Sequence, residues 1–558
     1  MAGKKRRRTV RFTDNGEINR LLTDVVSSVR DFTENQLEQI QTLTQIGAAL
    51  SAEHHIERLL EVIVDEARKL TNADGGTLYV LNDDKKRLEF AIVQNNSLGV
   101  RMGGTAGEIT WPPIELYSDD GTPNHANVSS YAALSGEVAN ISDVYQTEKF
   151  NFEGTRQFDS ETGYRSESML VVPMHNHEND IIGILQLLNA QDPEKMGTIP
   201  FSAESQKLTE SLASQAAIAH TNSHLIIELQ NLFESFVRTI ATAIDEKSPY
   251  TGDHGRRVVE ITMMIAGKIN DAAEGSFADI VFDKDEMNEL RIAAWLHDVG
   301  KVAVPEHVMD KPAKLKTVCD RIELLKTRIE VMKRDVEIEY LKRLHGNGNN
   351  SHTLANNKSY RRRIKKLDDE FSFLASINQG AEFMSDEDLE RLGRIARRKW
   401  TMNGDRLPLI TDDELENLAI RKGTLTDDER TIINSHAEIT YKMLSQMPFP
   451  KKLKNVPIYA SSHHECINGA GYPRGLMGDD ISLQARIIAL ADAFEALTAH
   501  DRPYREANTL SQAIRILGFM VKDGHLDKDL FDLFMKELVY LDYAERELDP
   551  SQIDEVEA

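Results

Sequence analysis

The sequence predicts a multidomain protein with a mixed α/β domain in its first half and a helical domain in its second half. The chain has 558 residues, which is enough for about three or four domains. Between residues 36 and 222 helical spacing alternates with short β-rich runs, whereas beyond Asp245 the apolar residues follow helical spacing. Two more helical runs within residues 316–423 indicate a helical hairpin inserted into the second half.

The composition is that of a globular protein, with 41% hydrophobic and 28% charged residues. No apolar run reaches the roughly 18 residues of a membrane-spanning helix, and no apolar core follows the basic start "MAGKKRRRTVRF". Only two cysteines occur, Cys319 and Cys466, which excludes a disulfide framework and favours a reducing compartment. We therefore expect a cytoplasmic protein without membrane insertion.

The net charge of −24 argues against a nucleic-acid polymer as partner, because such a surface repels polyanions. The charge is unevenly distributed. Residues 1–35 begin with a basic tail that leads into a helix, and residues 546–558 form an acidic tail. Charged runs at chain ends are usually solvated, so we interpret both as tails and keep a specific docking role as the alternative.

The α/β region, residues 36–222, begins with a predicted helix. Its apolar residues Leu59–Val64 follow an i, i+1, i+4, i+5 stripe. The run "GGTLYVLNDDKKRLEFAIVQ" predicts a β-hairpin around the polar turn Asn82–Lys86. The runs "SMLVVPM" and "DIIGILQLLNA" predict two more strands, and a helix from about Ala203 closes the region.

A connecting helix is predicted over residues 205–245, because this stretch holds no proline or glycine up to Ile244. Leu225, Leu229, Leu232 and Phe236 repeat at spacings of 4, 3 and 4, which is typical of a coiled-coil seam. An ordinary core face is the alternative. Between two domains we favour a parallel homodimer stalk, in which a rotation or register shift could pass a signal.

Three motifs in the α/β region resemble GAF domains, which are sensory α/β modules. These are "SGEVANISDVY", "FDSETGYRSESMLVVPM" and "GILQLLNA", and they look most like the GAF domains of cyclic-nucleotide phosphodiesterases and cyclases. The resemblance covers roughly residues 36–222 and implies a small ligand such as a cyclic nucleotide. Asn189, Phe201 and Glu204 fit the ligand signature of the family loosely. A GAF domain used only for dimerisation or relay is the alternative.

The second half gathers polar residues that are typical metal ligands. Five histidines and two aspartates lie on or beside apolar helices: His254, His297, Asp298, His436, His463, His464 and Asp492. Each alone would usually be a core or surface residue, but unpaired polar groups in apolar surroundings are costly. Imidazole and carboxylate suit zinc, iron and manganese. Two metals sharing a bridging carboxylate would satisfy all seven, and would suit in-line attack on a phosphodiester.

The motifs "HDVGK", "HHECINGAGYP" and "ALADAFEALTAHDRPYR" occur in this order and are similar to the HD-GYP subgroup of the HD-superfamily phosphohydrolases. The match covers roughly residues 228–315 and 424–545. It implies an all-α catalytic domain over residues 246–545, interrupted by the insertion 316–423. It further implies a metal-dependent phosphodiesterase that opens a cyclic dinucleotide, chiefly cyclic di-GMP, to a linear dinucleotide or GMP.

The resemblance also implies the chemistry of the metal centre. All seven residues named above would be ligands, with Asp298 bridging two ions of iron or manganese, zinc being less expected. Where three-metal members carry a glutamate, this chain has Tyr250, so we expect two metals. Two more departures lie nearby: Ser248 and Asn468 each stand where many members have an aspartate.

Substrate contacts are implied in the same way. Lys301 would contact the scissile phosphate or the nucleophile, and Arg502 and Arg505 would hold phosphates, as guanidinium groups do well. Tyr472 would line the substrate groove. Glu465 is interpreted as a carboxylate that orients a ligand histidine rather than as a ligand itself.

The insertion, residues 316–423, contains two apolar stripes with spacings of 3 and 4. The stripes are Ile322, Leu325, Ile329, Met332 and Val336, and then Ile364, Leu367, Phe371 and Leu374. They predict an antiparallel helical hairpin. We interpret it as a solvated arm, with dimer contact, lid and partner docking as alternatives.

Two other functions stay open at this point. The chain could be an HD-family phosphohydrolase of another nucleotide, such as a mixed cyclic dinucleotide. It could instead be a non-catalytic signalling module, because in some relatives the Gly-Tyr-Pro loop contacts diguanylate cyclase domains.

Overall fold

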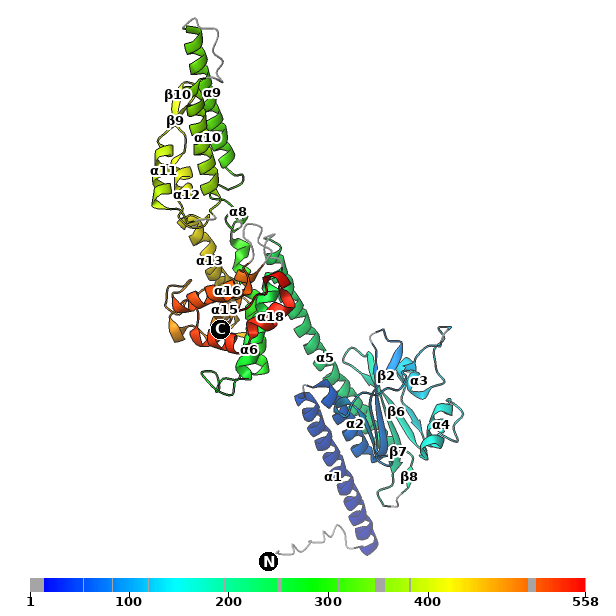
Figure 1. The fold of residues 1–558 in the computed structure, drawn as a ribbon. Coiled ribbons are helices and arrows are strands. Elements are labelled where there is room, and N and C mark those ends of the chain that lie inside the picture. The colour runs from blue at the N-terminus through cyan, green and yellow to red at the C-terminus, as the bar shows by residue number, and fades with distance from the viewer. Residues whose placement is uncertain are drawn as a thin grey trace, which may run out of the picture. The chain divides into compact units, whose positions relative to one another are not determined.

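The structure, a computed structural model, describes residues 15–556 except for residues 54, 83, 119, 195–196, 248–252, 310, 347–356, 381–382 and 500–507. The chain divides into two compact units, Met1–Asn231 and Leu232–Ala558, and Figure 1 labels their elements. Within the described part of the chain, no helix has both the length and the apolar character that crossing a membrane requires.

The first unit is built on one antiparallel sheet in the order β3-β2-β1-β7-β6-β5, with β4 beside β2 and β8 beside β7. The strands are β1 (Ala73–Leu81), β2 (Arg87–Asn95), β3 (Val100–Gly103), β4 (Ile114–Glu115), β5 (Ala139–Ile141), β6 (Met169–His175), β7 (Ile181–Gln191) and β8 (Thr198–Ile199). The predicted hairpin is confirmed, because β1 pairs with β2, and the two further predicted strands, β6 and β7, pair with each other.

Helices cover both faces of this sheet (Figure 1). One face packs against α2 (Ile56–Thr71) and the first part of α5, and the end of α1 (Gly16–Ala52) joins this core. The predicted stripe on α2 is buried, since Leu59–Val64 contains four buried apolar residues. The other face carries α3 (Val128–Ser135), and α4 (Glu153–Thr162) follows before β6.

The connecting helix is α5 (Ala203–Asp245), a single helix of 43 residues. Leu212 and Ala216 are buried in the core of the first unit, and Val237 is buried in the core of the second. The predicted seam lies between these two buried stretches. All four of its residues are exposed, to between 44% and 66%.

The second unit is helical, and its main core is formed by eight helices besides the end of α5. These are α6 (His254–Asn270), α7 (Lys284–Leu296), α13 (Asp427–Leu444), α14 (Val456–Ser461), α15 (Leu483–Thr498), α16 (Leu510–Lys522), α17 (Lys528–Lys536) and α18 (Val539–Glu547). A short 3₁₀ segment, η2 (Val299–Ala303), follows α7 and is itself followed by α8 (Glu306–Met309).

The insertion is more than the predicted hairpin. Helices α9 (Ile322–Gly346) and α10 (Lys358–Asn378) lie side by side (Figure 1), and their two apolar stripes meet in a shared core. That core also includes residues of α11 (Asp386–Ala396) and α12 (Asp412–Leu418).

A two-stranded hairpin in the insertion was missed by periodicity. Strand β9 (Lys399–Met402) pairs with β10 (Asp405–Pro408). Asn403 and Gly404 join them, with φ of 53° and 93°, as a tight two-residue turn requires. The Asn-Gly dipeptide was the available signal, but the strands are too short for an alternating pattern to stand out.

Candidate metal centre

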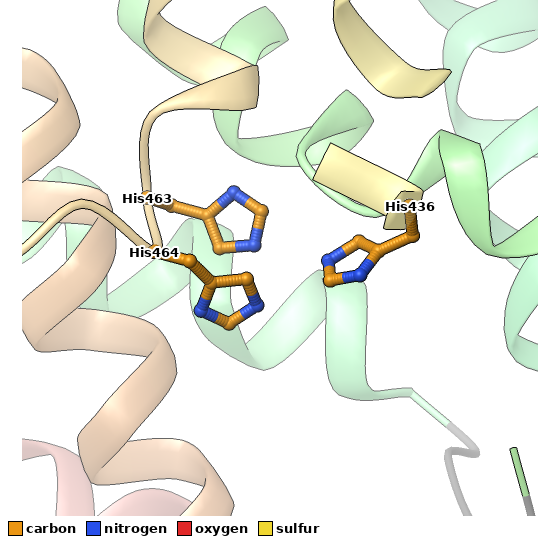
Figure 2. A group of neighbouring side chains, drawn as sticks. All are labelled: His436, His463 and His464. Atoms are coloured by element: carbon orange, nitrogen blue, oxygen red, sulfur yellow. The ribbon is translucent and has the colours of Figure 1, made fainter. Parts of the chain in front are cut away.

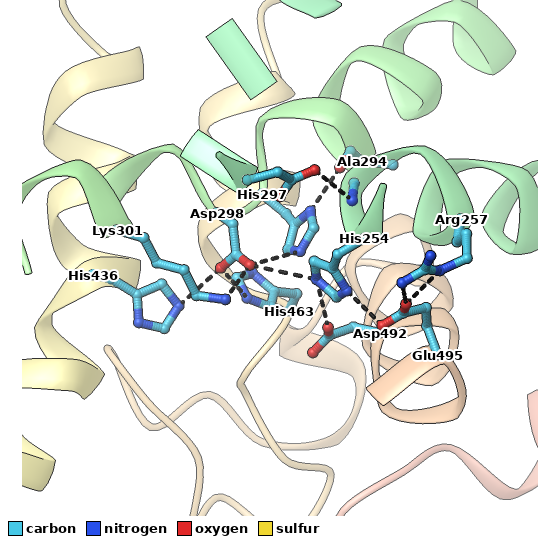
Figure 3. Close-up of polar contacts among 12 residues, drawn as sticks. His254, Arg257, Ala294, His297, Asp298, Lys301, His436, His463, Asp492 and Glu495 are labelled. Atoms are coloured by element: carbon cyan, nitrogen blue, oxygen red, sulfur yellow. Dashed lines mark hydrogen bonds and ion pairs between the residues drawn. The ribbon is translucent and has the colours of Figure 1, made fainter. Parts of the chain in front are cut away.

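The seven predicted ligands come from five chain segments and meet in the second unit, six of them labelled in Figure 3 and His464 in Figure 2. His254 begins α6, and His297 and Asp298 end α7. His436 lies midway along α13, His463 and His464 follow α14, and Asp492 lies midway along α15. The structure therefore brings together residues that are up to 238 positions apart in the chain.

Asp298 lies at the middle of the cluster. Its Oδ2 is 3.5 Å from Nε2 of His254 and 3.2 Å from Nε2 of His297. Its Oδ1 is 3.3 Å from Nε2 of His436 and 3.9 Å from Nε2 of His463. Each oxygen thus faces a different pair of histidines, which is the arrangement of a carboxylate between two cation positions.

The remaining donors complete two groups, one on each side of Asp298. Asp492 joins His254, with Oδ1 3.4 Å from Nε2, and these two with His297 form one group of donor atoms. The other group is His436, His463 and His464, whose rings converge in Figure 2. Two groups of donors joined by one carboxylate match the two-metal centre expected from the sequence.

Backbone carbonyls fix the tautomer of three of the histidines. The Nδ1 atoms of His297, His436 and His463 lie 2.6–2.7 Å from the carbonyl oxygen three residues earlier in the chain. Because Nδ1–H donates there, the lone pair of the neutral ring is on Nε2, which points into the cluster.

The buried polar atoms of the cluster require a positively charged partner. Among the described residues, Nε2 of His254, His297, His436 and His463 and Oδ1 of Asp298 are buried without a hydrogen-bond partner. A buried polar atom left without a partner costs about 1–3 kcal/mol, so five in one place would be a heavy penalty. The donor set therefore fits divalent metal ions, which would coordinate these atoms.

The pKa values of the clustered groups are shifted in both directions. Burial raises the pKa of Asp298, but the charges of Lys301 and His297 outweigh it and hold that pKa well below the ordinary value. Burial lowers the pKa of His463 to about 3, and burial together with His463 holds the pKa of His464 well below its ordinary value. Burial also disfavours the charge of His254, but Glu495 and Asp298 outweigh burial and raise its pKa to about 10, and Asp298 likewise raises the pKa of His297. Because metal binds neutral imidazole, a bound ion would displace the protons of these two rings.

Lys301 lies beside Asp298, the carboxylate at the middle of the cluster. It lies on η2, three residues after Asp298, and its Nζ donates to Oδ2 of Asp298. Gly300 allows η2 to approach α13 closely, since a Cβ on this residue would lie 2.0 Å from the carbonyl oxygen of His436. The "HDVGK" motif thus brings a carboxylate and a lysine against α13.

His254 is oriented by a carboxylate that the sequence reasoning missed. Its Nδ1 lies 2.5 Å from Oε2 of Glu495, whose other oxygen accepts from Nε of Arg257 at 2.7 Å. Glu495 is only 1% exposed. Burial disfavours its charge, but His254 and Arg257 outweigh burial and lower the pKa of Glu495 to about 2. The available signal was an acid three residues after Asp492 on one helix.

Glu465 does not orient a histidine as expected. Its two oxygens accept the backbone N–H groups of Arg474 at 2.8 Å and Leu476 at 2.9 Å. The buried carboxylate of Glu465 therefore holds the backbone that follows the Gly-Tyr-Pro sequence. We expected Glu465 to orient a predicted ligand histidine, but Glu495 is the carboxylate that contacts the Nδ1 atom of one, His254.

The Gly-Tyr-Pro loop closes against the histidine cluster. The Tyr472–Pro473 peptide bond is cis, and the Tyr472 ring lies 4.9 Å from the His464 ring between centroids. Asn468, which replaces the usual aspartate, donates from Nδ2 to the carbonyl oxygen of Asp523 at 2.8 Å. An amide can donate this hydrogen bond and a carboxylate cannot, so Asn468 fastens the loop to the turn after α16.

Several predicted residues lie outside the described part of the chain. These are Arg502 and Arg505, proposed as phosphate contacts, and Ser248 and Tyr250, which depart from the family pattern. Their assignments stay predictions.

The three residues matched to the GAF ligand signature lie in different surroundings. Asn189 is buried and bonded to Tyr164 and to the backbone of Arg165 and Glu167. Phe201 is buried in the helical core, and Glu204 is exposed in the first turn of α5. A groove of about 630 Å³ on this unit is lined by other residues.

Comparisons with known proteins identify both halves of the chain. The model of the GAF domain matches residues 55–220, and two models described as HD domain match residues 251–387 and 411–530. A solved GAF domain, from an Acinetobacter phosphoenolpyruvate-protein phosphotransferase, is 15% identical and covers 34% of this chain and 98% of that chain, with a TM-score of 0.26.

Two curated relatives are similar to part of this chain. A 3′3′-cGAMP-specific phosphodiesterase 1 of Vibrio cholerae is 39% identical over 22% of this chain and 27% of that protein. The cyclic di-GMP phosphodiesterase response regulator RpfG of Xanthomonas campestris is 39% identical over 18% of this chain and 26% of that protein. The matches thus span about a quarter of each relative. As the sequence motifs implied, this chain contains a GAF domain followed by an HD domain.

Proposed function

We propose that this chain is a metal-dependent phosphodiesterase that hydrolyses a cyclic dinucleotide under the control of its GAF domain. Cyclic di-GMP is the leading substrate, with a linear dinucleotide or GMP as product. The observation that carries the proposal is the placement of Asp298 between two groups of histidines whose inward Nε2 atoms lack partners. The names of the relatives support the class of substrate.

The proposed cofactor is a pair of divalent ions, with iron or manganese expected ahead of zinc. Histidine and carboxylate ligands accept all three, so the choice between them rests on the HD-GYP resemblance. Such ions supply Lewis acidity and an activated water to phosphodiester hydrolysis.

The protein's own groups would bind and orient the substrate around that centre. Lys301 holds Asp298 as the anion and presents a positive charge where a phosphate would approach. The Tyr472 ring lies beside the His464 ring and would limit the substrate groove. Arg502 and Arg505 are the proposed contacts for the phosphates, which guanidinium groups bind in bidentate fashion.

The remaining proposals concern location and partners. We place the protein in the cytoplasm, as a homodimer through the exposed seam of α5. The GAF domain would bind a small ligand such as a cyclic nucleotide. A diguanylate cyclase at the Gly-Tyr-Pro loop is the proposed partner if the chain also signals by contact.

A mixed cyclic dinucleotide is the second candidate substrate. Two relatives, 39% and 42% identical over short stretches, are named 3′3′-cGAMP-specific phosphodiesterases. The choice of base would be made by groove residues rather than by the metal ligands, so both substrates are compatible with one centre.

The test combines metal analysis of protein purified without oxygen with side-by-side turnover of cyclic di-GMP and 3′3′-cGAMP. We expect bound iron or manganese and hydrolysis of at least one of the two. Asp298→Ala removes the carboxylate between the two groups and should abolish both metal loading and turnover. Full turnover of Asp298→Ala with normal metal content would refute the site, and absence of turnover in the metal-loaded wild type would refute the activity.

A further inference from the structure

The end of α5 is hydrogen-bonded to two segments of the candidate metal centre, η2 and the start of α6. α5 closes the sheet of the first unit through Leu212 and Ala216, and its last turns pack into the core of the second unit through Val237. The helix ends at Asp245, and the turn after it carries Lys247. These two polar residues make the connections.

Lys247 binds the segment that carries Lys301. Its Nζ donates to the carbonyl oxygens of Lys301 at 3.0 Å, Val302 at 2.8 Å and Val304 at 2.6 Å. An ammonium group has three N–H donors, and here each has a carbonyl. A cation is favoured at the carbonyl end of a helical segment. Lys247 therefore caps the end of η2, the segment that follows Asp298 in the chain.

Asp245 binds the start of the helix that carries His254. Its Oδ2 accepts the backbone N–H of Gly255 at 3.1 Å. The residue at the N-cap position, Asp253, has φ of 62° and makes no capping hydrogen bond with its side chain. The α6 helix therefore takes its side-chain cap from α5, and Gly255 leaves room for it, since a Cβ there would be 3.2 Å from Oδ2.

The η2 segment is also held from the opposite side. Oγ1 of Thr440, on α13, accepts the N–H of Gly300 at 3.0 Å and donates to the carbonyl oxygen of His297 at 3.2 Å. The segment is thus fixed between α13, which carries His436, and the end of α5. A displacement of α5 relative to α13 would move Lys301 relative to His436.

From these contacts we infer that Asp245 and Lys247 are positioning residues through which α5 sets the geometry of the metal centre. Lys247 holds the segment from Asp298 to Lys301, and Asp245 holds the start of α6, where His254 lies. A rotation or shift of α5 reaches the reacting groups through these two side chains. The inference rests on the proposed hydrolysis and adds the route by which the GAF domain controls it.

The first test replaces the ammonium while keeping the side-chain stem. In the full chain, Lys247→Met should lower kcat about 10- to 100-fold, as small misplacements of catalytic groups do, with KM and metal content unchanged. Hydrogen exchange of the peptide covering residues 299–304 should become faster. A loss of metal in proportion to kcat, or unchanged exchange in this peptide, would overturn the inference.

A matched control separates positioning from general stability. Lys314 also donates from a buried ammonium to backbone carbonyls, those of Leu418 at 3.2 Å and Ile420 at 2.7 Å, both in the insertion. Lys314→Met should lower the melting temperature but leave exchange at 299–304 as in the wild type. Equal exchange changes in both variants would refute a specific link.

Asp245 is tested by a pair of substitutions. Asp245→Ala removes the acceptor of the Gly255 N–H. It should lower both kcat and metal retention, because His254 directly precedes Gly255 in the chain. Asp245→Asn keeps an acceptor and should restore most of the loss. If the two variants behave alike, the hydrogen bond to Gly255 does not position the helix.

Transmission along α5 is tested by turning the helix. Two alanines inserted after Gln230, in the exposed part of α5, rotate the two ends by about 200° relative to each other. We expect kcat to change in the wild-type background and to stay within about twofold in Lys247→Met. An equal change in both backgrounds would refute transmission through Lys247.

The readouts distinguish this inference from the proposed function. If the metal-loaded wild type hydrolyses no cyclic dinucleotide, the proposed function fails. Hydrogen exchange of residues 299–304 then still decides whether Lys247 holds η2, and metal retention decides whether Asp245 holds the start of α6.

Discussion

Two kinds of hydrogen-bond acceptor orient the histidines of the candidate metal centre. His297, His436 and His463 each use a carbonyl oxygen of their own segment, three residues earlier. His254 is the first residue of its helix. It uses Glu495 from α15 instead, and Arg257 neutralises that carboxylate.

Replacing Glu495 by glutamine should therefore weaken metal binding. The substitution keeps the shape but removes the charge that His254 and Arg257 face. Loss of a carboxylate behind a ligand histidine typically costs about 10- to 100-fold in metal affinity. The measurement is metal retained per chain during titration with a competing chelator.

Glu289 provides a matched control for Glu495. It is also a buried carboxylate of the second unit, and it accepts from the backbone N–H and the side chain of Asn455. Glu289→Gln should alter thermal stability and leave metal retention as in the wild type. Equal losses of metal in both variants would show that Glu495 acts only through general stability.

Gly300 is a second residue outside the predicted ligand set that we expect to affect the candidate metal centre. A Cβ there would meet the carbonyl oxygen of His436 at 2.0 Å and the backbone nitrogen of Thr440 at 2.7 Å. Gly300→Ala should push η2 away from α13, lower the melting temperature and reduce bound metal.

The control for this substitution is Gly267→Ala. Gly267 lies within α6 and has no neighbouring atom within 4 Å of a built Cβ. Alanine there should leave metal content unchanged and stabilise the fold by up to about 1 kcal/mol. If Gly300→Ala retains full metal content and stability, the close approach of η2 to α13 is not needed.

At the scale of elements, the insertion is held together by side chains as well as by its apolar core. Glu414, on α12, accepts from Arg328 of α9 at 2.7 Å and closes a capping box with Thr411. Burial disfavours the charge of Glu414, but the hydrogen bond from Arg328 and those from Thr411 outweigh it and lower its pKa. α12 is therefore attached to α9 through a charged carboxylate.

This lowered pKa predicts a dependence of stability on pH. A carboxyl group whose pKa is lower when folded stabilises the fold above its unfolded pKa, about 4.3. That contribution is lost as pH falls from there through the folded pKa. Thermal unfolding of the wild type between pH 6 and 3 should show the loss, and Glu414→Gln should show a smaller one. An identical slope in both proteins would contradict the assignment.

For the whole molecule, the exposed seam of α5 is an apolar stripe that a single chain leaves uncovered. Leu229 and Leu232 are 64% and 66% exposed, although they belong to a regular 4, 3, 4 apolar repeat. Apolar residues at this spacing are usually buried against a second helix. A second copy of α5 would cover them in parallel.

Leu232→Glu should accordingly convert a dimer into a monomer. A charge at a seam position would face its own copy across the interface, and buried like charges are strongly unfavourable. Sedimentation equilibrium measures the outcome, with Gln230→Glu, also exposed on α5, as the control that should stay dimeric. A wild type that sediments as a monomer at all concentrations would refute the dimer.

The sequence by itself determined the order of the domains and the seven metal-binding candidates. Local patterns carry this information: the apolar stripe of Leu59–Val64 specifies a helix, and "HDVGK" places a histidine and an aspartate at a helix end. Both features depend on neighbours in the chain, so they can be read before the fold is known. Ligand chemistry is likewise a property of residue type.

Only the tertiary structure decided which residues support those ligands. Glu465 lies next to two histidines in the sequence but bonds to Arg474 and Leu476, whereas Glu495 reaches His254 from a position 241 residues away. The same holds for Lys247 and the η2 carbonyls. Contacts of this kind depend on how helices pack, and packing brings together residues whose separation in the chain leaves no periodic trace.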